Sequence, residues 1–462
     1  GNTLPTVNDA RINLNNQPWS SPVVMNADTY SLRYTQRINP EWRWTAHAAS
    51  QRLLTQDRLA FPYGCSAENN YDRYCSDGSF DLYDYRSENE SRHRHALELA
   101  VHGQFKTGSL QHRLSWGVQQ NKLIQRFQMQ AYNYVGTGNV QGTAVTAADP
   151  ALTDQNTNRD ERSTEFFVRD AIQLTSDLTA WLGLRHSRLE RDSIRTNGSR
   201  ATSYQQSFTT PWLAASLALN PSTTVYASWG QGIESDVAPN RARFTNAGQA
   251  LPALRSRQTE VGLKNSGGPW SWSLAWFDIS RPVSASIGLE CFSDTPGNTC
   301  TRQTDGQARH QGIEASSTVR SGPWTLQGGL QWLHARRQNS QDATLNGKTP
   351  VNVPATTVKL QARYDVAALP GLALLGDVVS ESRRQVLPDN SVSIPRTQQV
   401  DLGLRYRHTS ASSPSATQWI WRVGVSNVFD QRRWRESPYQ FDHVYLYPMA
   451  PRTWRLSVQT DL

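Results

Sequence analysis

The sequence lacks any stretch approaching the ~18 consecutive apolar residues that a membrane-spanning helix requires, which argues against a helical membrane protein. It is also poor in the residues of a packed core. Hydrophobic residues make up 37% and charged residues 19% of its 462 residues, against ~45–50% and ~25% in an ordinary soluble domain. The motifs G-x-S-x-G and H-E-x-x-H and a phosphate-binding glycine loop are missing, so nothing supports an enzyme.

The chain is instead rich in large aromatic residues, 16 Trp and 16 Tyr, set in segments where apolar and polar residues alternate. In one segment, Trp419, Trp421 and Val423 alternate with Ile420 and Arg422. The same alternation recurs at 270–276, 402–406 and 454–458. A period of two predicts β-strands with two unlike faces. We expect the apolar face to meet lipid and the polar face to line a wet lumen.

The breaks between these segments alternate between very short and long. The short breaks lie at 38–41, 106–109, 175–177, 219–222, 265–269, 321–323 and 369–371. The long ones lie near 58–80, 130–160, 231–254, 285–304, 337–350, 382–394 and 430–443. Short periplasmic turns and long external loops are typical of an outer-membrane barrel. The aromatic residues beside the turns are expected to form an interfacial girdle: Trp42, Trp181, Trp270, Trp324 and Trp419.

The four cysteines form two close pairs, Cys65 with Cys75 and Cys291 with Cys300, each inside a long polar break. Two local disulfides in an oxidising compartment are the simplest interpretation. Zinc binding is the alternative, but neither pair has C-x-x-C spacing or neighbouring histidines.

In this setting the sequence resembles the β-barrel domain of TonB-dependent outer-membrane receptors, in the ferric-siderophore branch. The resemblance rests on segments that occur in the family's order along nearly the whole chain. They are 226–232 (YASWGQG), 251–264 (LPALRSRQTEVGLK), 277–279 (FDI), 305–306 (DG), 310–314 (HQGIE), 351–354 (VNVP), 426–430 (SNVFD) and 451–453 (PRT).

Two of these segments also support predictions that do not depend on the family resemblance. Alternation places Gln258, Glu260 and Lys264 on one strand face, pointing into the lumen. Asn427 and Asp430 stand where a strand gives way to a loop, where their side chains can satisfy backbone groups.

The resemblance implies an all-β, antiparallel transmembrane barrel of the 22-stranded type, closed by an N-terminal plug and energised through TonB. We count about seventeen strands, the first convincing one at 29–37, with 1–22 read as part of a long loop. We therefore expect 1–462 to be the C-terminal part of such a barrel, without the plug and about five strands.

Ligand recognition is expected at the outer mouth, where aromatic faces and cations suit anionic chelates that carry planar rings. The candidates are Tyr132, Tyr134, Trp229, Arg241, Arg243, Trp434, Tyr439 and Tyr445. The alternative is an interface anchor for each Trp or Tyr and a lipopolysaccharide contact for each Arg. His93 and His95 share a strand face, so a metal pair is conceivable, but the arginines around them favour a solvated face.

The expected function is uptake of a ferric siderophore across the outer membrane of a Gram-negative bacterium, without a resident cofactor or metal. The alternatives are a receptor for haem, cobalamin or another metal chelate, a passive porin, or an adhesive surface protein. The expected partners are the chelate, the TonB complex, reached through a region absent from this chain, and outer-membrane lipid with lipopolysaccharide. The net charge of +8 comes from dispersed Lys and Arg, which does not favour nucleic-acid binding.

Overall fold

A computed structural model describes residues 3–289, 291, 299–409, 417–440 and 442–461. Its principal sheet has 18 strands among these residues. They are β1 (Val24–Arg37), β2 (Trp42–Pro62), β3 (Ser79–Thr107), β4 (Leu110–Arg126), β5 (Ala131–Asn139), β6 (Thr157–Gln173), β7 (Leu178–Arg195), β8 (Thr202–Asn220), β9 (Thr223–Glu234), β10 (Leu254–Asn265), β11 (Trp270–Leu289), β12 (Thr299–Ser321), β13 (Trp324–Gln338), β14 (Thr356–Asp365), β15 (Leu372–Glu381), β18 (Thr397–Thr409), β19 (Gln418–Ser426) and β24 (Thr453–Asp461).

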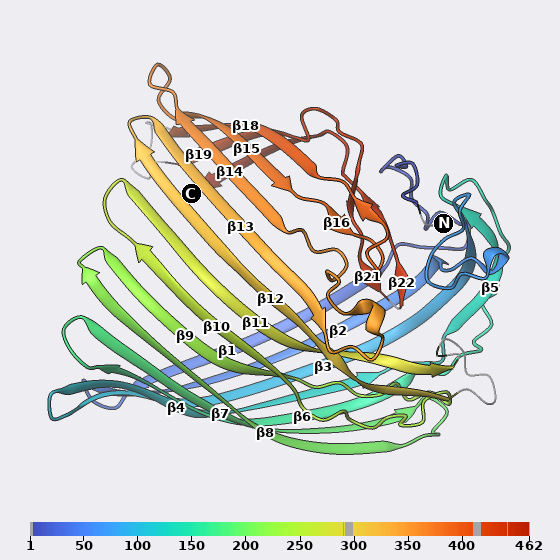
Figure 1. Cartoon of the computed structure of the whole chain (residues 1–462), viewed down its shortest axis with the longest axis horizontal. Helices are drawn as coiled ribbons and strands as arrows, with labels where there is room; N and C mark the ends of the chain where they lie inside the picture. Colours follow the sequence, from blue (N-terminus) through green and yellow to red (C-terminus); the bar gives the residue numbers. More distant parts are fainter. Residues whose placement is uncertain (1–2, 290, 292–298, 410–416, 441, 462) are drawn as a thin grey trace.

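The strands form one curved antiparallel sheet (Figure 1). Each of these strands pairs with its neighbours in the sequence, except that β5 pairs with β3 and β4 pairs with β6. Both β4 and β5 pair with β3 on the same side, so they occupy one place and the sheet has 17 places. This confirms the expected fold class and the count of about seventeen. Within the described residues, β1 pairs only with β2 and β24 only with β19, so both are edge strands.

The short connections lie at one end of the sheet and the long ones at the other, together with the N-terminal segment (Figure 1). Small elements fold within the long connections: β16 (Arg384–Gln385), β17 (Ser393–Ile394), β20 (Trp434–Glu436), β21 (Tyr439–Gln440), β22 (His443–Val444), β23 (Tyr447–Pro448), η1 (Ser66–Glu68) and η2 (Ala343–Leu345). Two expected breaks are shorter than predicted. Strand β5 fills part of 130–160, while β11 and β12 extend into 285–304 because their cross-strand pairing continues to Gly288 and Leu289.

The outer face of the sheet is an apolar band. Its side chains are exposed at alternate positions, as in Leu402 (50%) and Leu404 (45%) on β18 or Trp454 (70%) and Leu456 (71%) on β24. Of the expected girdle, Trp270, Trp324 and Trp419 are exposed on this face. The prediction is wrong for Trp181, because alternation puts it opposite to the exposed Leu182.

Burial is concentrated at the long-loop end rather than inside the sheet. One cluster of buried residues joins the loop after β15 to the last loop: Val386, Leu387, Val392, Ile394, Trp434 and Val444, with Leu4 and Val7 packed on it. A second consists of Ala60, Phe80 and Leu82, with Leu14 and Trp19 against it. The N-terminal segment thus packs on the long loops. No helix in the described part of the chain is long and apolar enough to cross a membrane.

Both predictions made for the segments 251–264 and 426–430 are confirmed. The Tyr226 hydroxyl on β9 donates to Glu260 Oε1 at 2.5 Å, and Lys264 Nζ lies 4.7 Å from the Tyr226 ring centre. Gly262 lies beneath that ring, where a Cβ would come within 2.6 Å of it. In the last loop, the Asn427 side chain donates to the carbonyls of Gln431 and Ala450 at 3.1 and 2.9 Å.

Candidate functional site

A set of aromatic side chains gathers at the long-loop end, which we name the mouth cluster. It consists of Phe61, Tyr63, Tyr74, Tyr83, Tyr132, His443 and Tyr445. These side chains come from β2, the β2–β3 loop, β3, β5 and the last loop. Residues far apart in the sequence therefore meet here because the strand ends bring their loops together.

Tyr132 anchors one side of the mouth cluster. It pairs with Tyr85 in the β3–β5 register, and its ring stacks on that of Tyr83 with centroids 4.5 Å apart and planes 3° from parallel. Tyr134 approaches the same Tyr83 ring edge-on at 6.0 Å and is 55% exposed. Planar rings presented this way offer stacking surfaces to an aromatic ligand.

His443 lies at the other side of the mouth cluster and is fully buried. Its ring centre is 4.8 Å from that of Tyr63 and 4.4 Å from that of Tyr445. The Gly64 N–H donates to His443 Nε2 at 3.1 Å, so the neutral ring carries its proton on Nδ1. Within the described structure, His443 Nδ1 and the buried Tyr445 hydroxyl have no hydrogen-bond partner. Burial lowers the pKa of His443 to about 4, against the opposing effect of the Asp72 carboxylate.

A cavity of about 840 Å³ opens beside these rings. Its wall includes Tyr74 and Tyr445 together with Trp434, Leu4 and Ile12. Trp434 is buried, and its indole N–H donates to the Pro5 carbonyl at 2.8 Å. The cavity is therefore lined by aromatic rings and hydroxyl groups of the long loops and by aliphatic side chains of the N-terminal segment.

The two predicted arginines lie in the loop after β9, and Arg241 joins that loop to the one between β5 and β6. Arg241 donates two hydrogen bonds to the Asp154 carboxylate at 2.7 and 3.1 Å. Burial raises the pKa of Asp154, but the hydrogen bonds from Arg241 and Gln130 outweigh it, and the pKa lies below its ordinary value. The Arg243 guanidinium lies 5.3 Å from the Phe244 ring centre.

The two remaining candidates are not members of the mouth cluster. Tyr439 on β21 pairs with Val444 and is 41% exposed. Trp229 on β9 is the cross-strand partner of Leu213, which is 50% exposed on the outer face, so Trp229 faces the membrane side. Of the predicted residues, the structure brings Tyr132 and Tyr445 into the mouth cluster and places Tyr134 against its Tyr83 ring. Tyr63, Tyr74, Tyr83 and His443 were not predicted. The Tyr-rich run around the first cysteine pair was an available signal for the three tyrosines, but no sequence signal indicated His443.

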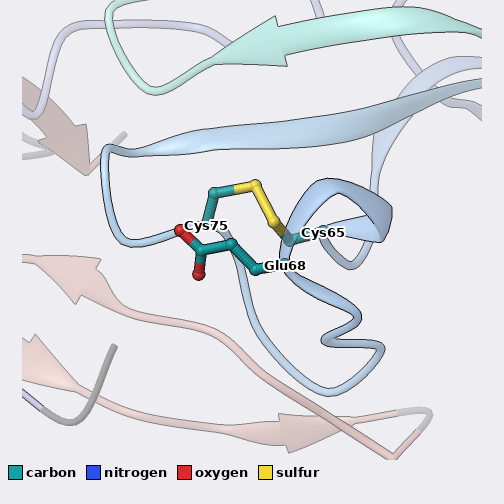
Figure 2. Close-up of side chains that lie close together, drawn as sticks. All are labelled: Cys65, Glu68 and Cys75. Atoms are coloured by element: carbon teal, nitrogen blue, oxygen red, sulfur yellow. A yellow bond between two sulfur atoms is a disulfide. The ribbon is translucent and has the colours of Figure 1, made fainter.

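Both predicted disulfides are present, with Cα atoms 5.1 Å apart in Cys65–Cys75 and 5.4 Å apart in Cys291–Cys300. Figure 2 shows Glu68 beside the first disulfide. Cys65, Glu68 and Cys75 are the single group of potential metal ligands found among the described residues. The two cysteine sulfurs are bonded to each other and are not thiolates, so the group does not fit zinc. The Glu68 carboxylate instead accepts hydrogen bonds from the Ser76 backbone and hydroxyl, which lower the pKa of Glu68.

The chain is similar to known proteins over most of its length. The family model described as "TonB dependent receptor-like, beta-barrel" matches residues 1–428. Among curated proteins, the ferrichrome receptor FcuA of Yersinia enterocolitica is 24% identical over 78% of this chain and 47% of its own length. The metal-pseudopaline receptor CntO of Pseudomonas aeruginosa is 23% identical over 96% of this chain and 60% of its own length. The chain thus spans about half to three fifths of these relatives.

Solved structures agree in fold. The ferric preacinetobactin receptor BauA of Acinetobacter baumannii has a TM-score of 0.79 at 22% identity, with 95% of this chain and 63% of that one covered. The ferric-catecholate import receptor Fiu of E. coli K12 has a TM-score of 0.76 at 15% identity, with 96% and 65% covered. Such proteins lie in the outer membrane of Gram-negative bacteria and are transporters rather than enzymes. The family match, the apolar outer band and the turn asymmetry agree, and the chain belongs to the β-barrel domain family of TonB-dependent outer-membrane receptors.

Proposed function

We propose that this chain forms most of the barrel of a receptor that takes up a ferric siderophore and engages the chelate at the mouth cluster. The observation that carries the proposal is the stacked pair Tyr83–Tyr132, which contacts Phe61 on the wall of the cavity that Tyr74 and Tyr445 also line. Stacking on planar rings suits chelates with aromatic groups, and nearby tyrosine hydroxyls suit their oxygen atoms.

A longer receptor is proposed because both β1 and β24 have an unpaired edge among the described residues. Backbone N–H and C=O groups left unpaired in lipid cost several kcal/mol each. Further strands, about five in a 22-stranded barrel, would satisfy them. A plug within the lumen and coupling to the TonB complex belong to the same proposal.

The test is titration of the full-length receptor with ferric hydroxamate, ferric catecholate and mixed chelates, followed by Trp fluorescence. Tyr132→Ala is expected to weaken binding of the recognised chelate about 5- to 150-fold, because stacking of a planar ligand ring on one aromatic side chain is worth about 1–3 kcal/mol. The matched control is Tyr364→Ala at the short-turn end, which packs on Trp324 far from the loops and is expected to bind normally.

The second candidate is a receptor for haem, cobalamin or another metal chelate. This second candidate is retained because the chain is similar to a relative named a metal-pseudopaline receptor. Binding of one of these ligands while every ferric siderophore fails would overturn the siderophore assignment. Membership of the receptor family argues against a passive porin.

A further inference from the structure

The wall of the cavity at the long-loop end carries very little charge. Among the described residues that line it, only Asp9, Arg73 and Asp77 are charged, and most of the others are aliphatic or aromatic. The cavity volume of about 840 Å³ lies within the range of small-molecule sites, which is roughly 300–1,000 Å³. The cavity is therefore large enough for a chelate, and its wall is mainly apolar.

The one cation among these lining residues is already paired. Arg73 donates two hydrogen bonds to the Asp72 carboxylate at 2.9 and 2.8 Å. Asp9 forms an ion pair with Arg11 at 3.2 Å. Asp77 accepts hydrogen bonds from a serine and has no cationic partner in the described part of the chain. The wall thus offers an anion no unpaired positive charge, and it presents one unpaired carboxylate.

Other arginines of the long loops do not line the cavity. Neither Arg241 nor Arg243, the two predicted at the mouth, belongs to the described wall. Arg241 is held by the Asp154 carboxylate. Arg433, next to the cavity residue Trp434, donates to a backbone carbonyl at 3.2 Å. The cations of these loops therefore hold the loops together and leave the cavity without positive charge.

The rings around the cavity also disfavour an anion. Burial raises the pKa of Tyr63 to about 12, with further contributions from the carboxylates of Asp442 and Asp72 and a weaker opposing one from Arg243. Desolvation and these carboxylates disfavour the phenolate, and both effects act in the same way on an anionic ligand. The faces of aromatic rings are themselves negative. The environment of the mouth cluster therefore favours a ligand without negative charge.

We propose that the chelate recognised at this cavity has no net negative charge and belongs to the ferric trihydroxamate class. Three singly charged hydroxamates balance Fe³⁺, whereas three doubly charged catecholates leave three negative charges. The apolar wall contacts the carbon skeleton of the chelate. The Tyr445 hydroxyl, which has no partner within the described structure, is a donor for a hydroxamate oxygen. The inference rests on the proposed function, because it concerns the same cavity.

The test varies the charge of one chelate scaffold while its iron-binding groups stay the same. A linear ferric trihydroxamate is prepared with its terminal amine free, acetylated or succinylated, which gives one positive charge, none or one negative charge. Each form and a ferric tricatecholate are titrated into the full-length receptor and followed by Trp fluorescence. Because an unpaired charge loses hydration in the cavity, we expect the succinylated form to bind about tenfold more weakly than the acetylated form. The tricatecholate is expected to bind at least about 100-fold more weakly.

A cation added to the wall should relax this selectivity. Gln440 lines the cavity and is exposed, so Gln440→Arg changes the charge without disturbing a buried contact. It is expected to improve binding of the succinylated form and the tricatecholate about tenfold or more, through a charge-assisted hydrogen bond, and to leave the acetylated form unchanged. The matched control is Gln341→Arg, an exposed position in the loop after β13 that does not line the cavity, and it is expected to change none of the affinities.

Asp77→Asn keeps the test available if Gln440→Arg disturbs the last loop. It removes the unpaired carboxylate and is expected to improve binding of the succinylated form about threefold.

The inference would be overturned if the succinylated form bound as tightly as the acetylated one, or if the tricatecholate bound more tightly than every trihydroxamate. In either case uptake of a ferric siderophore would still stand. Failure of all the ferric chelates would instead refute the proposed function itself, so the two failures are distinguished.

Discussion

Replacement of Leu360 by arginine tests which face of the sheet meets lipid. Leu360 on β14 is 54% exposed and is the register partner of Gly328, which lies midway between Trp324 and Trp332 on β13. Those two tryptophans are eight residue steps apart, about 20 Å along the membrane normal at a tilt of about 40°. Leu360 is therefore expected roughly 10 Å from either interface, near the bilayer midplane.

An arginine at the midplane of a barrel's lipid face costs about 2–4 kcal/mol. We therefore expect Leu360→Arg to shift the folding equilibrium roughly 30- to 700-fold toward the unfolded state. The assay is guanidinium unfolding of the full-length receptor in phosphatidylcholine vesicles, followed by Trp fluorescence.

The matched control is Gln361→Arg, one residue further along the same strand. Gln361 points to the opposite face, with Gln327 and Asp377 as register partners, so a new cation there meets polar groups and a carboxylate. Its expected effect is within about 0.5 kcal/mol. If Gln361→Arg destabilised the receptor as much as Leu360→Arg, the assignment of the two faces would be refuted.

Three further predictions concern the long loops. Replacing both Cys65 and Cys75 by serine is expected to destabilise the first long loop by about 3 kcal/mol, because the disulfide closes a loop of 10 residues; limited proteolysis checks this. Trp434→Ala is expected to release the N-terminal segment at a cost of about 3–5 kcal/mol, seen as faster amide exchange around Pro5 while the barrel strands stay protected. Because His443 has its pKa lowered from 6.5 to about 4, its contribution to stability is complete above pH 6.5 and is lost as pH falls toward 4, by roughly 3 kcal/mol. Protease sensitivity of the last loop is expected to rise over that pH interval, and a pH-independent loop would contradict the buried, neutral imidazole.

The faces of the strands were predictable from the sequence because strand alternation is local. Trp419 and Trp421 face the same side of the sheet whichever strand pairs with theirs. The same argument applies to Trp229: Tyr226 and Ser228 share one face, so Trp229, which follows Ser228, lies on the opposite, outer face. The extent of the strands was less predictable. Pairing with a long neighbour carries β11 and β12 into segments whose composition suggests a loop.

The mouth cluster could be predicted only in part. His443 accepts its hydrogen bond from Gly64, 379 residues away in the sequence. No periodicity along one strand indicates which loops meet, so Tyr83 and His443 were not identified, whereas Tyr132 and Tyr445 were found by their residue type and place in a long loop. Arg241 lies in a long loop, as predicted, but its pairing with Asp154 depends on a second loop.

The pairing of nearly every strand with its neighbours in the sequence has a kinetic consequence. The sheet can grow by adding one hairpin at a time, and each step closes only a short stretch of chain, so the entropic barrier per step stays small despite the size of the product. The growing edge, however, always exposes a row of backbone donors and acceptors that could pair with another chain. Expressed alone, residues 24–461 would retain two such edges, on β1 and β24. We therefore expect this segment to self-associate through strand addition unless an assembly factor or further strands cover both edges.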